Sequence, residues 1–293
     1  MQRWGYGSDC DCRLKTFDDF FEEWFKQIPN ENHSTVTAIL ENLEYYSHRT
    51  TNNLLEKIHN NLMNNKEFYI TDDNTIYVFI KSKDGLTNSS NDYWMEYKNI
   101  NNINKNICIE NMDMLDEDDM VYITNIVFVD DFSGTGKSFI NELRKCPSRY
   151  RNKNIHFVTI SIMFDSINKI SKYCAKNDIN IYFHATSCKE KAFESNIFEN
   201  NKEAKKEICA MSFGFDIPKS HIMGFEDSQA LVVFYNNTPN NTLGFIRFDN
   251  EKYKSIFPRR NDKVPGWMDL KKKRQKQNMT NYSNKVRSKE YGL

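Results

Sequence analysis

The chain has 293 residues, and its 40 Lys and Arg balance its 40 Asp and Glu, so its formal net charge is zero. This length suits one large domain or two small ones, and a neutral chain has no overall field that attracts nucleic acid. Its seven cysteines are odd in number and lack a disulfide-framework spacing, which favours reduced thiols. No apolar run approaches the ~20 residues of a membrane span, and the N-terminus has no signal-peptide core. We therefore expect a soluble protein of the cytoplasm with no membrane contact.

The N-terminal segment reads as helical. One helical face between residues 16 and 29 gathers Phe17, Phe20, Phe21, Trp24 and Phe25. Apolar residues at helical spacing continue from Val36 to Leu62. We predict that residues 1–65 form a helical cap ahead of the main domain.

Strands and helices alternate in the rest of the chain. Residues 75–80, 155–164 and 179–183 are rich in β-branched and aromatic residues and read as strands. Helical patterns cover residues 165–177 and 198–213. Strands that are separated by helices form right-handed βαβ units. We therefore predict an α/β core over residues 66–262, a mainly parallel sheet flanked by helices.

The most informative stretch begins at residue 126. Residues 126–129 are all apolar, as in a strand buried on both faces, and Asp130 and Asp131 follow where that strand should end. A loop of small residues covers 133–138, and an apolar helical pattern begins at Phe139. A strand, a small-residue turn and a helix N-terminus together make an anion site. Two carboxylates beside a phosphate repel it unless ribose hydroxyls or a metal lie between them.

Two interpretations that use the residues alone remain open for this stretch. Gly136, Lys137 and Ser138 fit the end of a nucleotide-binding P-loop, but the opening glycine of that pattern falls on Asp131. The other interpretation is a solvated turn after a core strand, because Asp, Ser and Gly all favour turns.

The stretch also resembles the signature of type I phosphoribosyltransferases, in which an apolar strand, an Asp-Asp pair and Thr-Gly-x-Ser follow one another. The resemblance implies that Asp130 and Asp131 hold the ribose 2′- and 3′-hydroxyls of phosphoribosyl diphosphate. It implies a 5′-phosphate cradle made of Ser133, Gly134, Thr135, Gly136, Lys137 and Ser138. It also implies Mg²⁺ that arrives on the diphosphate, with no dedicated metal ligands in the protein. The chain departs from that signature directly after the acidic pair, at Phe132.

In that family the loop after the first core strand binds pyrophosphate. By position, the candidates here are Lys81, Ser82, Lys83, Ser89 and Ser90. A polar surface turn is the alternative for this loop. His184 follows the last predicted strand, where it is either structural or within reach of the site.

A second informative stretch joins a buried strand at residues 230–235 to a loop rich in amides. We predict that the acceptor of the reaction is oriented by Asn236, Asn237, Thr238, Asn240 and Asn241. Amide and hydroxyl groups bond a polar ligand without adding charge, although the same residues also favour plain turns.

This strand and loop, with residues 256–259, resemble the C-terminal signature of a phosphoribosyltransferase-like family from prokaryotic conflict systems. The resemblance extends from about Phe17 to Arg260. Some members of that family are effectors encoded beside retron reverse transcriptases. The resemblance therefore implies the toxic effector of an anti-phage, retron-type defence system.

The last segment, residues 263–293, is rich in Lys and Arg and reads as a basic C-terminal tail. Such a tail is often only solvated, but it also suits contacts with nucleic acid phosphates. If a retron is involved, we expect this tail to contact the reverse transcriptase with its non-coding RNA or DNA.

The sequence thus favours a phosphoribosyltransferase-like enzyme that acts on phosphoribosyl diphosphate or a related nucleotide. Two alternatives remain open. One is a P-loop-like nucleotide hydrolase that uses Lys137, and the other is a non-catalytic nucleotide sensor or partner-binding protein.

Overall fold

A computed structural model describes residues 13–14, 17–80 and 89–260 of the chain. Contacts between residues group positions 1–259 into one compact unit and 260–293 into another, and the description below concerns the first. The domain boundaries predicted at residues 65 and 262 stay predictions. The basic tail and its proposed partner contacts lie outside the described residues.

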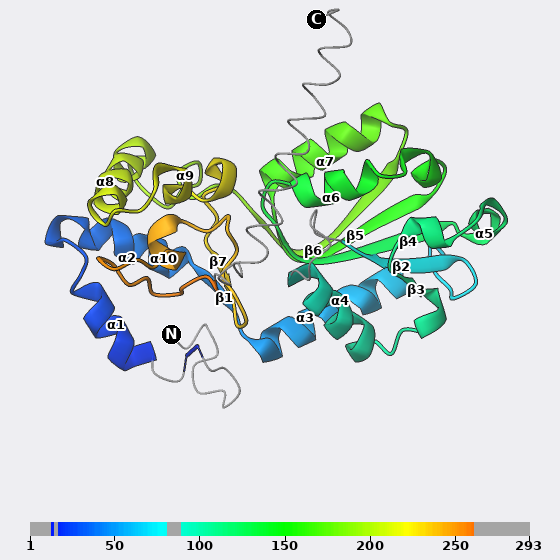
Figure 1. Cartoon of the computed structure of the whole chain (residues 1–293), viewed down its shortest axis with the longest axis horizontal. Helices are drawn as coiled ribbons and strands as arrows, with labels where there is room; N and C mark the ends of the chain where they lie inside the picture. Colours follow the sequence, from blue (N-terminus) through cyan, green and yellow to red (C-terminus); the bar gives the residue numbers. More distant parts are fainter. Residues whose placement is uncertain (1–12, 15–16, 81–88, 261–293) are drawn as a thin grey trace, which may run out of the picture. The chain divides into compact units, whose positions relative to one another are not determined.

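The main sheet has five strands in the order β3-β2-β4-β5-β6, and every neighbouring pair is parallel (Figure 1). Its strands are β2 (Thr75–Phe79), β3 (Cys108–Ile109), β4 (Asn125–Ser133), β5 (Asn154–Met163) and β6 (Asn180–Lys189). The predicted α/β fold with a mainly parallel sheet is confirmed. β4, which carries the acidic pair, lies at the centre of the sheet.

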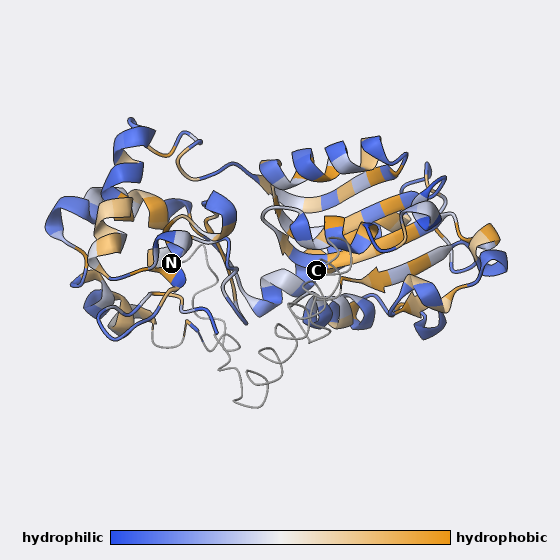
Figure 2. Ribbon diagram, turned by 45° about the horizontal axis from the view of Figure 1, so that its top comes forward, coloured by the Kyte–Doolittle hydropathy of each residue, from blue (hydrophilic) through white to orange (hydrophobic). Residues whose placement is uncertain are grey.

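Helices cover both faces of this sheet because alternate residues of β4 point to opposite faces. Ile126 and Phe128 belong to the core shared with α6 (Lys137–Leu143) and α7 (Phe164–Lys176). Val127 and Val129 belong to the core shared with α3 (His48–Met63) and α4 (Ser89–Ile100). Figure 2 shows apolar strands beneath helices whose outer faces are hydrophilic.

The N-terminal segment is not purely helical. It contains α1 (Phe17–Phe25), α2 (His33–Asn42) and then a short strand, β1 (Glu44–Tyr46). This strand pairs in parallel with β7 (Val232–Phe234) in a second, two-stranded sheet. In the aromatic stripe of α1, Phe17 and Trp24 are buried in the core, whereas Phe20 is exposed. The partners of the buried residues come from the end of the unit, since Trp24 donates to the Tyr253 hydroxyl over 2.8 Å. The segment therefore packs with the C-terminal part of the unit, and only α3 packs on the main sheet.

The remaining helices are short or pack in the core that the N-terminal segment shares with the C-terminal part of the unit. They are α5 (Glu117–Tyr122), α8 (Asn201–Gly214), α9 (Lys219–Ile222), α10 (Gly244–Arg247) and the 3₁₀ turns Asn30–Asn32, Lys105–Ile107, Met112–Met114, Pro147–Tyr150 and Phe225–Asp227. Among the described residues, every helix is too short or too polar to cross a bilayer.

Candidate active site

The acidic pair lies inside strand β4 rather than after it. Asp130 and Asp131 are 6% and 9% exposed, and the strand continues to Ser133. It continues because β5 runs alongside, pairing Phe132 with Ser161. The predicted strand end at residue 129 is therefore wrong: pairing with β5 overrides the turn preference of Asp and Ser. The carboxylates are consequently held by the sheet itself, near its carboxyl-terminal edge.

The two carboxylates of this pair interact strongly. Asp130 Oδ1 accepts a hydrogen bond from Ser90 Oγ at 2.6 Å and another from the Asp131 backbone N–H at 3.0 Å. Burial, followed by the nearby Asp131 carboxylate, raises the pKa of Asp130 well above its ordinary value. A ligand that brings positive charge or donates hydroxyl hydrogens would relieve this cost.

The predicted pyrophosphate residues are only partly described. Ser90 lies beside Asp130, and Ser89 begins helix α4. Lys81, Ser82 and Lys83 lie outside the described residues. The role of this loop stays a prediction, and Ser90 is the member that the structure places at the acidic pair.

The small-residue loop is shorter than predicted, since Ser133 belongs to β4 and Lys137 begins α6. Gly136 adopts a left-handed φ of 71°, and a Cβ there would lie 2.8 Å from Ile170 Cγ1, so glycine is required. The Ser133 hydroxyl is bonded to Ser166 Oγ at 2.7 Å. The side chain of Ser133 is therefore engaged with α7.

The other residues of the predicted cradle differ in where they lie. Ser138 lines the cavity described below, and Thr135 is buried. The Lys137 ammonium group is 2.6 Å from Glu226 Oε1 and lies over the Phe225 ring. Lys137 thus bonds a carboxylate, in contrast to the lysine of a P-loop, which reaches the phosphates.

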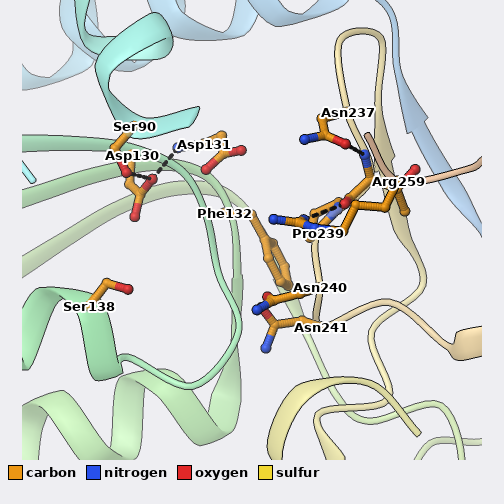
Figure 3. Close-up of a pocket in the computed structure, with 11 residues that line it drawn as sticks. Ser90, Asp130, Asp131, Phe132, Ser138, Asn237, Pro239, Asn240, Asn241 and Arg259 are labelled. Atoms are coloured by element: carbon orange, nitrogen blue, oxygen red, sulfur yellow. Dashed lines mark hydrogen bonds between the residues drawn. The ribbon is translucent and has the colours of Figure 1, made fainter. Parts of the chain in front are cut away.

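The acidic pair opens on a cavity of about 200 Å³ (Figure 3). Its walls come from α4, β4, the start of α6, the segment around Pro239, and Arg259. The lining residues are Ser90, Asp130, Asp131, Phe132, Ser138, Asn237, Thr238, Pro239, Asn240, Asn241 and Arg259. The two stretches singled out by the sequence therefore face one cavity.

Not every predicted acceptor residue turns its side chain to that cavity. Asn236 Oδ1 accepts a hydrogen bond from the Tyr93 hydroxyl at 2.9 Å. Thr238 is fully buried, and its hydroxyl donates to the Phe257 carbonyl at 2.7 Å. The Thr238 hydroxyl also accepts a hydrogen bond from Arg13 Nη2 at 2.9 Å. These side chains hold the loop in place from behind.

Arg259 is a site residue that the reading of the sequence did not single out. Its Nη1 donates to the Thr238 carbonyl at 2.6 Å. Burial lowers the pKa of Arg259, and the charge of nearby Asp131 opposes that shift. Among the described lining residues, Arg259 is the one that carries a full positive charge. The signal that could have found Arg259 is its place in residues 256–259, which belong to the C-terminal stretch that carries the family resemblance.

His184 belongs to a structural network and not to the cavity. It lies within β6, where its Nε2 is 3.0 Å from His156 Nδ1. His156 in turn contacts Asn125 at the start of β4, so the pair lies toward the amino end of the strands. Within the described part of the chain, no three or more His, Cys, Asp or Glu side chains gather into a set that could hold a metal.

Known proteins resemble this chain to different degrees. A search of curated proteins found no match. Among solved structures, the xanthine-guanine-hypoxanthine phosphoribosyltransferase of Helicobacter pylori is similar at 10% identity and a TM-score of 0.32, over 51% of this chain and 85% of that one. A hypothetical protein from Neisseria gonorrhoeae with bound ppGpp is similar at 11% identity and a TM-score of 0.32, over 56% of this chain and 97% of that one. The family model described as PRTase-CE matches residues 21–259, a span that includes both walls of the cavity. The chain therefore belongs to the PRTase-CE family of phosphoribosyltransferase-like proteins.

Proposed function

We propose that the protein binds phosphoribosyl diphosphate, or a related nucleotide, in this cavity and transfers its phosphoribosyl group at ribose C1. The observation that carries the proposal is the buried pair Asp130 and Asp131 on the cavity wall. Carboxylates accept hydrogen bonds from two neighbouring ribose hydroxyls, and such donors would offset the burial that raises the pKa of Asp130. The cavity is smaller than the roughly 300–1,000 Å³ of pockets for larger ligands, which suits one sugar phosphate unit.

The chemistry is displacement at C1, with pyrophosphate as the leaving group. The C1–O bond to pyrophosphate breaks and a bond from C1 to the acceptor forms, through a transition state with oxocarbenium character. The protein supplies position and charge stabilisation and no nucleophile of its own. Asp130 and Asp131 hold the ribose, and the net negative charge of the pair favours the positive charge that develops on the sugar. Arg259 is available for an anionic group across the cavity.

Mg²⁺ would fit this donor set, because hard carboxylate oxygens are the ligands it prefers. Asp130 and Asp131 are the residues that would hold an ion carried in on the substrate. When bound, the ion neutralises charge on the departing pyrophosphate.

The ion pair between Lys137 and Glu226 favours this function over nucleotide hydrolysis at a P-loop. A P-loop lysine reaches the β- and γ-phosphates, but Lys137 bonds Glu226 instead. A non-catalytic sensor would use the same ribose grip and differs only in releasing no pyrophosphate.

We also propose that the activity serves anti-phage defence, with the protein as the toxic effector of a retron-type system. The resemblance of the 230–259 region to conflict-system proteins supports this role. A partner complex of reverse transcriptase and non-coding nucleic acid is expected to bind through the tail. Equal retention of that nucleic acid by the full chain and by a chain lacking residues 268–293 would contradict the tail contact.

Calorimetric titration tests the central proposal. Wild type, the double variant Asp130→Asn/Asp131→Asn and the exposed control Asp73→Asn are titrated with phosphoribosyl diphosphate and Mg²⁺, and with ATP and Mg²⁺. We expect wild type and control to bind phosphoribosyl diphosphate and the double variant to bind at least ~100-fold more weakly, as two charge-assisted hydrogen bonds are lost. Unchanged binding by the double variant would sink the proposal, and binding of ATP alone would restore the P-loop interpretation. Pyrophosphate release in the bound complex separates the enzyme from the sensor.

A further inference from the structure

Two glycines leave the space that Asn241 fills: Gly134 borders its side chain, and Gly224 borders its backbone carbonyl. A Cβ on Gly134 would lie 2.2 Å from Asn241 Cγ, and a Cβ on Gly224 would lie 2.0 Å from the Asn241 carbonyl oxygen. That carbonyl accepts hydrogen bonds from the Ala230 N–H at 3.1 Å and from Ser228 Oγ at 2.9 Å. The backbone of Asn241 is therefore held on one side, and its carboxamide lies directly against Gly134 on the other.

The amide nitrogen of this carboxamide has no hydrogen-bond partner. Asn241 is 8% exposed, and its Nδ2 is buried without a partner among the described residues. Buried donors are nearly always satisfied in native proteins, so an unpaired one calls for an explanation. The residue lines the cavity, as Figure 3 shows. A ligand that fills the cavity would supply the partner that this donor lacks.

The neighbours of Asn241 indicate which part of the ligand it meets. Gly134 is the first residue after β4 and opens the loop that leads to α6. Of the side-chain donors that flank this loop, Ser133 is bonded to Ser166 and Lys137 to Glu226, whereas Ser138 lines the cavity. An amide NH₂ donates and does not accept, so its partner must be an acceptor such as an anionic oxygen.

We propose that Asn241 Nδ2 donates a hydrogen bond to a phosphate oxygen of the phosphoribosyl ligand. Asn241 then belongs to phosphate recognition at the Gly134 loop rather than to the binding of the acceptor. The inference rests on the proposed function, because it assigns one contact of the same ligand. A neutral amide donor at this position stabilises the phosphate. Lys137 does not supply that contact, because it is paired with Glu226.

The test uses the full chain and compares Asn241→Asp with Asn61→Asp, an exposed residue of α3 at which the change of charge is the same. Binding of AMP, adenosine and phosphoribosyl diphosphate with Mg²⁺ is measured by calorimetry. We expect Asn241→Asp to bind the two phosphorylated probes roughly tenfold to a hundredfold more weakly than wild type, because one charge-assisted hydrogen bond is lost. Adenosine, which lacks the phosphate, is expected to bind equally to both variants. Asn241→Ala, which removes atoms from the space between the glycines, gives the same comparison if the Asp variant does not fold.

Three results separate this inference from the function on which it rests. Binding of AMP and phosphoribosyl diphosphate by Asn241→Ala or Asn241→Asp within threefold of wild type overturns the inference alone. A loss in these variants that Asp131→Asn does not share supports the phosphate contact and overturns the ribose grip. A wild-type protein that binds neither phosphorylated probe overturns both.

Discussion

The two walls of the cavity are built on different principles. The strand wall is β4, whose nine residues are all buried and whose backbone pairs with β2 and β5 on its two sides. The loop wall, residues 237–241, is irregular and depends on side chains from distant parts of the chain. Arg13 and Arg259 both bond it, as does the carbonyl of Phe257.

This difference determines how each wall responds to mutation. The position of the strand wall follows from a ladder of backbone hydrogen bonds that no single side chain supplies. The loop wall depends on a few side-chain hydrogen bonds, each of which one substitution removes. We expect its geometry to be the more easily lost.

The largest effect is expected from Arg13→Ala, which breaks the loop wall alone. Arg13 donates to the Phe234 carbonyl at 2.7 Å, to Thr238 Oγ1 at 2.9 Å and to the Pro258 carbonyl at 3.0 Å. Loss of these bonds should lower the free energy of unfolding by about 2–3 kcal/mol. Urea unfolding measures the change, and calorimetry shows whether the affinity for phosphoribosyl diphosphate falls with it.

The matched control for Arg13 is Arg151→Ala, an exposed arginine after the 3₁₀ turn at Pro147–Tyr150. Its unfolding free energy should stay within about 0.5 kcal/mol of wild type. Equal stability and ligand affinity in both variants would show that the loop wall does not need Arg13.

The pH dependence of the unfolding free energy of Asp130→Asn tests the strand wall. Burial and Asp131 raise the pKa of Asp130 in the folded state, so the folded protein keeps a proton that the unfolded chain releases near pH ~3.9. This contribution to stability is present below that pH and is lost as the pH rises toward the raised folded pKa. Wild type should therefore lose unfolding free energy relative to Asp130→Asn as the pH rises from about 4 to about 8.

Urea unfolding of wild type, Asp130→Asn and Asp73→Asn across this pH range checks the expectation. Groups that titrate alike in all three proteins cancel in the differences. Asp73 is exposed, and its variant should follow wild type. A difference between wild type and Asp130→Asn that does not change with pH would show that the pair carries no raised pKa.

The smallest effect is expected from Lys137→Met. This change removes the ion pair between Lys137, the first residue of α6, and Glu226 in the Phe225–Asp227 turn. The pair joins half-exposed side chains, so its loss should cost at most about 1 kcal/mol of unfolding free energy. Ligand affinity should change less than threefold. Lys57→Met, at an exposed position of α3, is the control for loss of one charge. A fall in ATP affinity of more than tenfold only in Lys137→Met would identify a P-loop lysine.

Local patterns in the sequence were sufficient for four of the five strands of the main sheet, all but β3, and for one wall of the site. Four apolar residues before Asp130 predicted a strand buried on both faces, and alternating helices predicted parallel neighbours. Such patterns are informative because the spacing of apolar residues within an element reflects which of its faces are buried. The amide-rich loop after β7 was also visible, as a set of polar residues without an assigned orientation.

The tertiary structure decided what depends on contacts between distant residues. Pairing with β5 carried β4 past the acidic pair, although Asp and Ser favour a turn. The same kind of contact paired β1 with β7, brought Arg259 to the cavity and pressed Asn241 against Gly134. Some of these residues were visible as candidates, as Asn241 was, but their contacts were not, because each residue's own neighbours along the chain fit several environments equally well. The sequence therefore determined which elements form and which side chains were candidates, and only packing between segments far apart in the chain decided which of those side chains meet.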